Sequence, residues 1–423
     1  MLDAKFIRQN PDVVREALKK RNDRYDLDAF CELDEKRRLI LAKVEEINAA
    51  QNRIDQEIQS LIKTKKDPKP KIEEGKKLKT DLVRINGEYA RLNEQFKTEL
   101  LKIPNIPHES LPVGDASHNK VVREGGTKKE FKFAPRDHIE LAEALDIIDF
   151  KRAAKLSGSN FVLFKGDGAR LVRALINFML DIHTDEHGYK EIVPPVIVNR
   201  DSMTATGQLP KLEEDMYVTK EDGLFLIPTA EVPLTNIHRN DVLEYDELPI
   251  QYTAYTPCFR REAGSYGKDT RGLMRVHQFD KVELVKFVKP DTSYDELEKL
   301  LAHAIKIIEL LGIPYRVLLL ASGDISFAAA KCYDIEIYAP GLDRWLEVSS
   351  CSNFEDFQAR RGNIRYKDPD MGKMQFVHTL NGSGVALARL IVAILENYQN
   401  EDGSIEIPEP LRRYMNGKVR IEK

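Results

Sequence analysis

Residues 258–286 read CFRREAGSYGKDTRGLMRVHQFDKVELVK. The stretch begins as a strand, passes through a loop that holds three glycines, and returns as a second strand. Side chains alternate between the two faces of a strand, so residues two or four apart lie on one face. We therefore expect Arg260 and Glu262 to share a face of the first strand, and Phe279 and Glu283 to share a face of the second.

This combination of side chains suits a nucleotide. A guanidinium can bind phosphate, a carboxylate can accept a hydrogen bond from an exocyclic amine, and an aromatic ring can stack on a base. The alternative is a surface hairpin with exposed ion pairs, which an isolated Arg-x-Glu pattern would favour.

The regions around this stretch indicate a sheet backed by helices. Strands are predicted at 191–198, 224–227, 251–260, 276–288, 315–320, 332–339 and 344–350. Helices are predicted at 137–156 and 168–187, and a buried one at 384–397. Closely spaced strands with few helices between them favour a mainly antiparallel sheet and an α+β fold.

The first hundred residues have a different pattern. Apolar residues follow 4-3 spacing from Leu33 to Leu61, with Arg37 and Gln51 as polar breaks, and the spacing resumes from Leu78 to Phe96. Such a seam is typical of a coiled coil. The KDPKP segment at 66–70 cannot continue a helix, because proline lacks an N–H and clashes with the preceding turn. We predict an antiparallel hairpin over about 28–100, with ~35-residue arms roughly 50 Å long.

The tip of this hairpin, residues 63–79, is basic. Eight lysines face three acidic residues there. A solvated tip is one interpretation, and a phosphate-binding tip is the other, because lysines neutralise backbone phosphates whatever the base sequence. The lysines are Lys63, Lys65, Lys66, Lys69, Lys71, Lys76, Lys77 and Lys79.

Composition narrows the class of protein. The 423 residues carry 65 Lys and Arg against 69 Asp and Glu, a net charge of −4, which excludes a uniformly basic nucleic-acid binder. Apolar runs are too short to span a bilayer, so no membrane partner is expected. The four cysteines lie far apart, which argues against disulfides and zinc and fits a reducing compartment. Residues 1–21 lack the apolar core of a signal peptide, so we expect a cytoplasmic protein.

Several motifs occur together in one order. FRREAGSYGKDTRGLMRVHQFDKVE (259–283) resembles the second signature motif of class II aminoacyl-tRNA synthetases, in the form seen in seryl-tRNA synthetases of the bacterial type. HGYKEIVPPVIVNR (187–200) resembles the first motif, with Pro194 as its dimer-interface proline, and NGSGVALARLIVAILENYQ (381–399) resembles the third. TGQLPK (206–211), PTAEVPLTN (228–236) and LEVSSCSNFEDFQARR (346–361) resemble the loops and strand between them. The resemblance covers essentially the whole chain.

The resemblance implies three regions and one activity. Residues 1–104 would form a tRNA-binding domain with the coiled-coil arm, 105–120 a linker, and 121–423 the class II catalytic domain. The enzyme would activate L-serine with ATP and Mg²⁺ to seryl-adenylate and transfer it to tRNA(Ser), and also to tRNA(Sec). A homodimer without zinc is expected.

The resemblance also assigns site residues. For catalysis these are Arg260 and Arg389; for serine, Thr229, Ala230, Glu231, Glu283 and Ser383; for Mg²⁺, Glu347 and Ser350. For ATP they are Arg260, Arg261, Glu262, Arg275, Val276, Phe279, Glu347, Val348, Ser349, Ser350 and Arg389. Tyr266, Lys268 and Arg271 would touch the acceptor end of tRNA. Gly382 and Gly384 are predicted to make a tight turn beside the ligand.

Physical chemistry agrees with these assignments. Adenylate formation joins two anions, so the site must supply cations and positioning more than acid–base groups. A pocket built to hydrogen-bond a hydroxyl rejects alanine, because its polar groups would stay buried and unpaired. Glu231 and Glu283 can take either the substrate ammonium or its hydroxyl. Cys258 and Cys351 are interpreted as small buried hydrophobes, and His277 as structural.

Two other functions compete with this one. A synthetase-like paralogue could load an amino acid onto a non-tRNA carrier, but such a protein would lack a working tRNA arm. A non-catalytic homologue could act as a binding protein, but the charged residues of the motifs are all present.

Overall fold

The computed structural model of the chain describes residues 1–263 and 271–423. They divide into two compact units. The smaller unit contains residues 2–18 and 24–104, and the larger contains Met1, 19–23 and 105–423. Among the described residues, no helix is long and apolar enough to cross a lipid bilayer.

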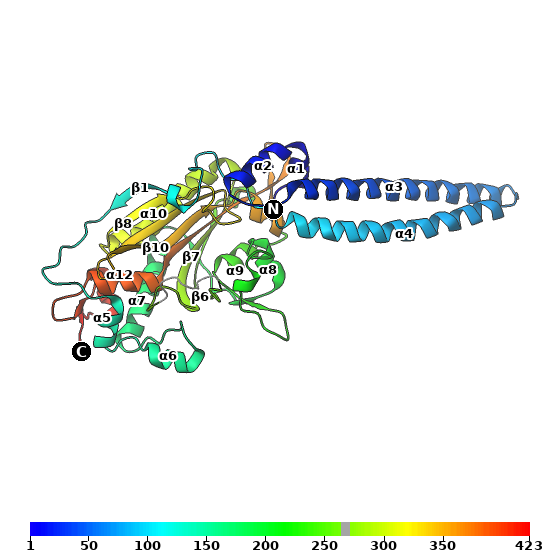
Figure 1. Cartoon of the computed structure of the whole chain (residues 1–423). Coiled ribbons are helices and arrows are strands. Elements are labelled where there is room, and N and C mark those ends of the chain that lie inside the picture. Colours follow the sequence, from blue (N-terminus) through cyan, green and yellow to red (C-terminus); the bar gives the residue numbers. More distant parts are fainter. Residues whose placement is uncertain (264–270) are drawn as a thin grey trace. The chain divides into compact units, whose positions relative to one another are not determined.

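The smaller unit is helical. Its elements are α1 (Ala4–Gln9), α2 (Pro11–Lys20, whose last two residues belong to the larger unit), α3 (Leu27–Lys63) and α4 (Lys69–Leu100). The long helices α3 and α4 lie side by side as an antiparallel hairpin (Figure 1). All positions of the 4-3 seam are buried or half-buried, and the buried ones are Val44, Ile54, Ile85, Leu92 and Phe96. The predicted coiled-coil hairpin is therefore confirmed.

The two prolines of the tip act differently. Pro68 ends the turn and directly precedes α4, whereas Pro70 lies inside the first turn of that helix. The first residues of a helix have N–H groups without partners in the helix, so proline is tolerated there at no cost in hydrogen bonds. The chain reverses within residues 64–68.

A charge cluster fixes the base of the hairpin. The Asp34 carboxylate is almost fully buried, and it accepts hydrogen bonds from Arg37 at 2.8 Å and from Arg8 of α1 at 2.9 Å. The Arg37 guanidinium also lies 4.2 Å above the ring of Phe96, which stacks on Phe30. Arg38 adds a third, more distant cation at 3.6 Å, so the buried Asp34 carboxylate is neutralised by arginines of its own unit.

The larger unit is built on a sheet of eight strands in the order β1-β8-β9-β10-β13-β7-β6-β2. All neighbours pair antiparallel except β2 and β6, which are parallel. This confirms the α+β fold with a mainly antiparallel sheet. Its strands are β1 (Lys120–Gly125), β2 (Lys190–Glu191), β6 (Ile250–Phe259), β7 (Gln278–Val288), β8 (Tyr315–Leu319), β9 (Lys331–Ala339), β10 (Arg344–Asn353) and β13 (His378–Ala386).

Shorter elements complete the unit. The remaining strands are β3 (Ile197–Val198), β4 (Phe225–Leu226), β5 (Val242–Leu243), β11 (Arg365–Asp368), β12 (Lys373–Phe376), β14 (Ile405–Glu406) and β15 (Arg420–Ile421). The helices are α5 (His138–Ala144), α6 (Phe150–Ser157), α7 (Asp167–Asp181), α8 (Arg200–Ala205), α9 (Glu231–Asn236), α10 (Ser293–Leu310), α11 (Phe357–Gly362), α12 (Leu387–Asn397) and α13 (Glu409–Arg412). Short helical turns are η1 (Ala116–His118), η2 (Ile182–Glu186), η3 (Glu213–Asp215), η4 (Tyr245–Glu247), η5 (Pro290–Thr292) and η6 (Arg413–Met415).

Helices α7, α10 and α12 cover one face of the large sheet and bury its main core (Figure 1). On β7, Val282, Leu284 and Val288 belong to this core. Residues of the opposite parity on the same strand, such as Val285 and Phe287, pack in a second core with α9. The strand period of two therefore separates a helix-covered face from the face that carries the cleft described below.

Three element predictions are wrong in detail. The strand expected at 191–198 is two short strands, β2 and β3, that join different sheets. The helix expected at 137–156 is broken, because Asp146 has a left-handed φ of 56° and Asp149 caps a new helix by accepting from the Arg152 N–H at 2.8 Å. The final helix begins at Leu387 rather than 384, because β13 continues to Ala386.

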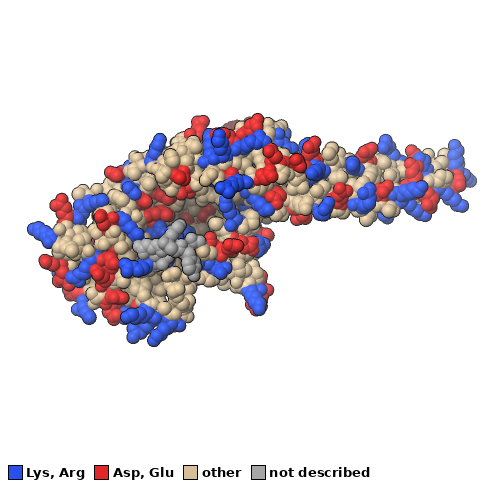
Figure 2. Space-filling model, viewed as in Figure 1, with Lys and Arg blue, Asp and Glu red and all other residues tan. Residues whose placement is uncertain are grey.

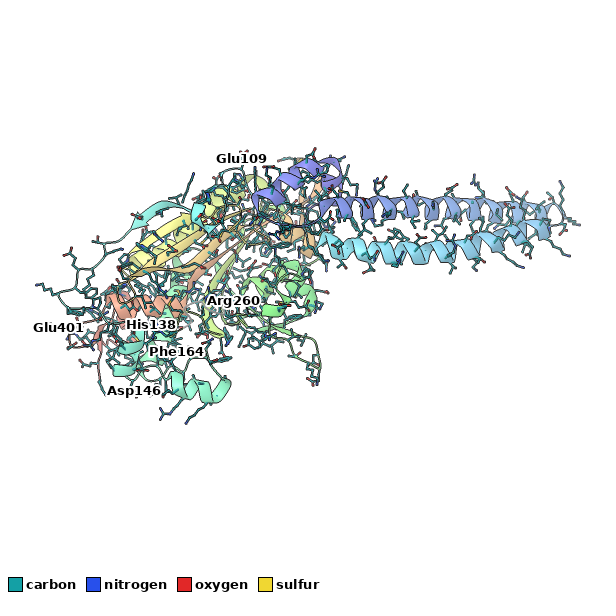
Figure 3. The ribbon with its side chains drawn as sticks, viewed as in Figure 1. Glu109, His138, Asp146, Phe164, Arg260 and Glu401 are labelled. Carbon is teal, nitrogen blue, oxygen red and sulfur yellow. The ribbon has the colours of Figure 1, made fainter. Side chains whose placement is uncertain are left out.

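A buried pair, His138 and Glu396, connects helix α5 to α12. Figure 3 labels His138. His138 Nδ1 lies 3.1 Å from Glu396 Oε1, and His138 Nε2 accepts from the Leu273 N–H at 3.3 Å. These two contacts fix the tautomer of the ring. Nε2 carries no hydrogen because it accepts from Leu273, and Nδ1 carries the hydrogen that faces the Glu396 carboxylate. This chain of bonds anchors the segment that leads into β7.

Candidate active site

A cleft of about 600 Å³ opens on the sheet face that the three core helices leave uncovered. In the space-filling view a recess is visible in the larger unit, with acidic side chains in part of its wall (Figure 2). All of its lining residues belong to that unit. The sequence-predicted residues among them are Thr229, Glu231, Arg260, Glu262, Arg275, Val276, Phe279, Glu347, Val348, Ser349, Ser350, Ser383 and Arg389.

Strand β7 supplies the floor. Phe279 and Lys281 line the cleft, and Glu283 lies fully buried on the same face of the strand. The shared face of Phe279 and Glu283 follows from strand alternation, as predicted. Lys281 was missed, although the same alternation places it between them; its Nζ lies 2.7 Å from Glu283 Oε2.

The segment after β6 brings two charged side chains, Arg260 and Glu262, to the cleft. The strand ends at Phe259, so Arg260 and Glu262 follow it rather than share its face, which corrects the prediction. The Arg260 guanidinium lies 5.2 Å from the centre of the Phe279 ring (Figure 3 labels Arg260). Glu262 has a left-handed φ of 50° and pairs with Arg275 at 2.8 Å. A strained non-glycine residue of this kind is common at functional sites.

Arg261 does not line the cleft. Its guanidinium donates to the Glu214 carbonyl at 3.3 Å on an exposed surface, and its backbone N–H donates to the Asp215 carbonyl. Of the three residues in the Arg-Arg-Glu run, the structure therefore brings the first and the third into the cleft, whereas the second helps to hold the segment from outside.

A β-bulge brings Glu347 and Ser350 together. Residues three apart on a regular strand point to opposite faces, but the pairing of β10 with β9 shifts by one residue between Glu347 and Ser349. Both Glu347 and Ser350 consequently line the cleft. A carboxylate and a hydroxyl are oxygen ligands that suit Mg²⁺. Arg389, at the start of α12, donates to the Glu347 carbonyl at 2.6 Å and lies 3.4 Å from its carboxylate.

Two acidic side chains meet at the inner end of the cleft. The Asn381 amide donates to Glu231 at 2.9 Å and to Glu283 at 3.2 Å, so one amide bridges the two carboxylates. Burial and the nearby charge of Glu283 raise the pKa of Glu231 to about 7. Lys281 is the closest cation to Glu283. This end of the cleft is therefore shaped to receive a further positive group.

The other residues that were predicted to bind the amino acid serine differ in their placement. Thr229 and Ser383 reach the cleft, and Thr229 Oγ1 accepts from the Glu231 N–H at 3.2 Å. Ala230 is fully buried and does not line the cleft. Ser383 lies on β13 directly opposite Glu283 on β7.

The tight turn predicted around Ser383 is wrong. Gly382 and Gly384 lie inside β13. A Cβ on Gly382 would stand 2.3 Å from Leu300, and one on Gly384 would stand 2.7 Å from the His183 ring. The glycines therefore let the strand approach side chains of the core, rather than letting the backbone approach a ligand.

Residues that sequence reasoning did not select also build the site. Asn381 and Asp215 line the cleft, and Gln358 donates to Glu231 from behind. Asn381 and Gln358 lie inside two of the quoted motifs, 381–399 and 346–361, so membership of those motifs was the signal that could have found them, whereas Asp215 lies in none.

The residues interpreted as structural lie outside the cleft. Cys258 and Cys351 are fully buried, burial raises the pKa of both thiols, and neither lines the cleft. His277 faces Phe161 and its Nδ1 lies 3.0 Å from the Arg260 carbonyl. The interpretation of the two cysteines as small buried side chains is confirmed, and the structural role of His277 stays a prediction.

The candidate tRNA contacts lie in two places. Seven of the eight tip lysines are exposed, whereas Lys71 is half-buried between Glu57 and Glu74, each at 2.9 Å. Basic side chains gather at the end of the hairpin in Figure 2. Arg271 is exposed on the larger unit, and Tyr266 and Lys268 lie outside the described residues.

With this geometry in place, comparison with known proteins identifies the class. Residues 214–398 match the family model described as the tRNA synthetase class II core domain (G, H, P, S and T). The cleft lies mostly within this span. The large antiparallel sheet and its cleft are thus those of a class II aminoacyl-tRNA synthetase.

The whole chain narrows the class to one family. Residues 1–107 match the model of the seryl-tRNA synthetase N-terminal domain. The chain is 54% identical to proteins named serine–tRNA ligase from Carboxydothermus hydrogenoformans and Trichlorobacter lovleyi, over the full length of both. The crystal structure of seryl-tRNA synthetase from Pyrococcus horikoshii complexed with ATP superposes with a TM-score of 0.92 at 37% identity, covering 100% of this chain and 99% of that one. The chain belongs to the seryl-tRNA synthetase family, as its motifs indicated, and is an aminoacyl-tRNA ligase.

Proposed function

We propose that the chain activates L-serine with ATP and transfers the seryl group to the 3′ end of tRNA(Ser), and also of tRNA(Sec). The observation that carries this proposal is the cleft itself. Three arginines and a bulged Glu–Ser pair lie at one part of it, and two bridged carboxylates lie at its inner end. Phosphates and a substrate ammonium would each find charges of the opposite sign there.

The first step joins two anions. An oxygen of the serine carboxylate attacks the α-phosphorus of ATP, and the bond to pyrophosphate breaks. We assign the bridging of both reactants to Arg260, because its guanidinium already stands beside Phe279, the proposed adenine platform. Arg275 and Arg389 would bind the outer phosphates once ATP replaces their present partners, Glu262 and Glu347. Such preorganised cations stabilise the charge that develops in the transition state.

Mg²⁺ fits the bulged pair. Glu347 and Ser350 would hold the ion with a carboxylate and a hydroxyl from one face of β10, and Arg389 beside them suits the phosphates of ATP. When bound, the ion would neutralise phosphate charge and favour the departure of pyrophosphate.

Serine would bind at the inner end. Its ammonium would meet Glu231 and Glu283, and its hydroxyl would reach the polar groups of Thr229 and Ser383. Alanine would leave these buried groups unpaired, which is a strong basis for rejection. The relatives named serine–tRNA ligase over their full length support this substrate.

The smaller unit would bind the tRNA. Its lysine-rich tip, rigid helical arms and match to the seryl-tRNA synthetase N-terminal domain support this role. Contacts to shape and backbone are expected, because the seam residues face inward and the outer faces carry mainly lysine and glutamate. The same match argues against a paralogue that loads a carrier protein. A homodimer in the cytoplasm completes the proposal.

Serine-dependent exchange of pyrophosphate with ATP tests the assignment. We expect exchange in the intact chain and in a variant in which residues 30–100 are replaced by a short linker, with charging of tRNA(Ser) lost only in the variant. Absence of exchange with serine in the folded, intact chain would refute the activity. Retention of tRNA charging without the arm would refute the role of the smaller unit.

A further inference from the structure

Glu231 is held from behind by a side chain that does not reach the cleft. Gln358 of α11 is buried, with 1% of its surface exposed, and it is absent from the cleft lining. Its Nε2 donates to Glu231 Oε1 at 2.6 Å. The other carboxylate oxygen, Oε2, accepts from Asn381 at 2.9 Å. Glu231 is therefore clamped between two amide donors, one on each oxygen.

The orientation of the Gln358 amide is itself fixed. Its Nε2 also donates to the Thr206 carbonyl at 3.1 Å, and a carbonyl can only accept. Its Oε1 accepts from the Thr379 hydroxyl at 2.7 Å. A flipped amide would set oxygen against oxygen at Thr206 and at Glu231. One N–H of the amide must consequently face Glu231 and the other Thr206 in the folded chain.

We propose that Gln358 is a positioning residue for the amino-acid substrate, which keeps the Glu231 carboxylate turned toward the cleft as the acceptor for the substrate ammonium. This inference rests on the proposed function. Gln358 does not line the cleft itself, so it acts on a ligand through the residues it bonds, and Glu231 is the charged one among them.

The charges around Glu231 explain why the Gln358 hydrogen bond matters. Burial and Glu283 on β7 oppose ionisation of Glu231, whereas the Gln358 bond, Lys281 on β7 and Arg260 beyond β6 favour it. These opposing effects hold the pKa of Glu231 near 7. A donor that always presents N–H favours the charged form, so loss of Gln358 would raise that pKa further. Serine would then meet a neutral acid at neutral pH.

Gln358→Met tests the proposal, since methionine keeps the volume and removes the donor. We expect the KM for serine in pyrophosphate exchange to rise by about 10- to 100-fold, the range for a lost hydrogen bond to a charged group. The KM for ATP should stay within about twofold. The acid limb of kcat/KM for serine should move upward in pH, so that raising the pH from 7 to about 8.5 restores part of the loss.

Two further variants keep the test sharp. Thr379→Val removes only the hydroxyl that orients the amide, and we expect the same changes at a smaller size, even if Gln358→Met folds poorly. Gln375→Met is the matched control, because Gln375 also donates to a carboxylate, that of Asp368, at 2.8 Å and lies outside the cleft lining. It should leave both KM values and the pH profile unchanged.

The outcomes separate this inference from the proposed function. Wild-type exchange with serine, together with an unaltered serine KM and pH profile in Gln358→Met and Thr379→Val, overturns the positioning role alone. Parallel loss for serine and ATP, with no shift of the acid limb, indicates a purely structural glutamine and also overturns it. No exchange with serine in the wild-type chain overturns the proposed function and this inference with it.

Discussion

Both units of this chain bury carboxylates, but they neutralise them differently. In the helical hairpin, Asp34 receives two arginines of its own unit, Arg8 and Arg37, within 3 Å. In the cleft, Glu231 receives only amide N–H groups and stands near a second carboxylate, Glu283. Burying a charge is costly unless it is paired. The hairpin is thus complete on its own, whereas the cleft keeps part of its negative charge for a ligand.

The largest expected effect is in the cleft. Arg260→Ala should lower kcat/KM for serine-dependent exchange by about 10²- to 10³-fold, because a preorganised cation at the reacting phosphate is lost. Arg261→Ala is the matched control: its guanidinium faces the Glu214 carbonyl outside the cleft, so we expect less than about a tenfold loss. Equal losses in both variants would contradict the division of roles between the two arginines.

The second-largest expected effect is a loss of stability at the base of the hairpin. Asp34→Ala leaves Arg8, Arg37 and the more distant Arg38 without their buried partner and should destabilise the base of the arm by about 3 kcal/mol. Amide hydrogen exchange on the whole chain would show about a 100-fold loss of protection at the base of α3 and α4, with the strands around the cleft unchanged. Glu35→Ala, at an exposed neighbouring position, should change neither region. Lost protection in the cleft strands would show that the units are not independent.

A smaller effect comes from pH. Since the Glu231 pKa is raised to about 7, the carboxylate is charged above that value and becomes neutral below it. At pH 6 about one tenth remains ionised, so kcat/KM for serine should fall about tenfold from its alkaline plateau. The KM for ATP should not follow this curve. A serine KM that is constant between pH 6 and 8 would contradict the pairing of Glu231 with the substrate ammonium.

The smallest effect concerns the tip. Lys65→Ala with Lys66→Ala should raise the KM for tRNA about threefold and reduce the slope of log affinity against log salt by about 1 to 2. Pyrophosphate exchange should be unaffected. Lys132→Ala with Lys220→Ala, at exposed positions of the larger unit, is the control for net charge. An unchanged slope of log affinity against log salt would contradict phosphate binding by the tip and favour the interpretation as a solvated surface.

The two regions also differ in what sequence can predict. The seam from Leu33 to Leu61 repeats a local spacing, so its burial follows from helix geometry alone. Likewise, Phe279 and Glu283 share a face through simple strand alternation. In each case the pattern and the contact lie on the same element, and the prediction was correct.

Contacts between distant elements were beyond such reasoning. The bulge between Glu347 and Ser349 exists only through pairing with β9, yet it is what turns Glu347 and Ser350 to one face. Gln358 meets Glu231 across 127 residues of chain, through the packing of α11. The helix start at 384 was wrong for a similar reason, since pairing with β7 extends β13 to Ala386.

The bridging amide of Asn381 has one more consequence. Two acids share that single amide, and the Lys281 ammonium pairs with one of them, Glu283, at 2.7 Å. In the proposed function the ammonium of the amino acid would bind between them and complete the charge balance of the interior, so the bound substrate would also stabilise the fold. Binding to the folded chain alone stabilises it by mass action. The resistance of this protein to unfolding and proteolysis should therefore increase with the concentration of its amino-acid substrate. When that amino acid is scarce, the unliganded enzyme should be degraded faster than the liganded enzyme.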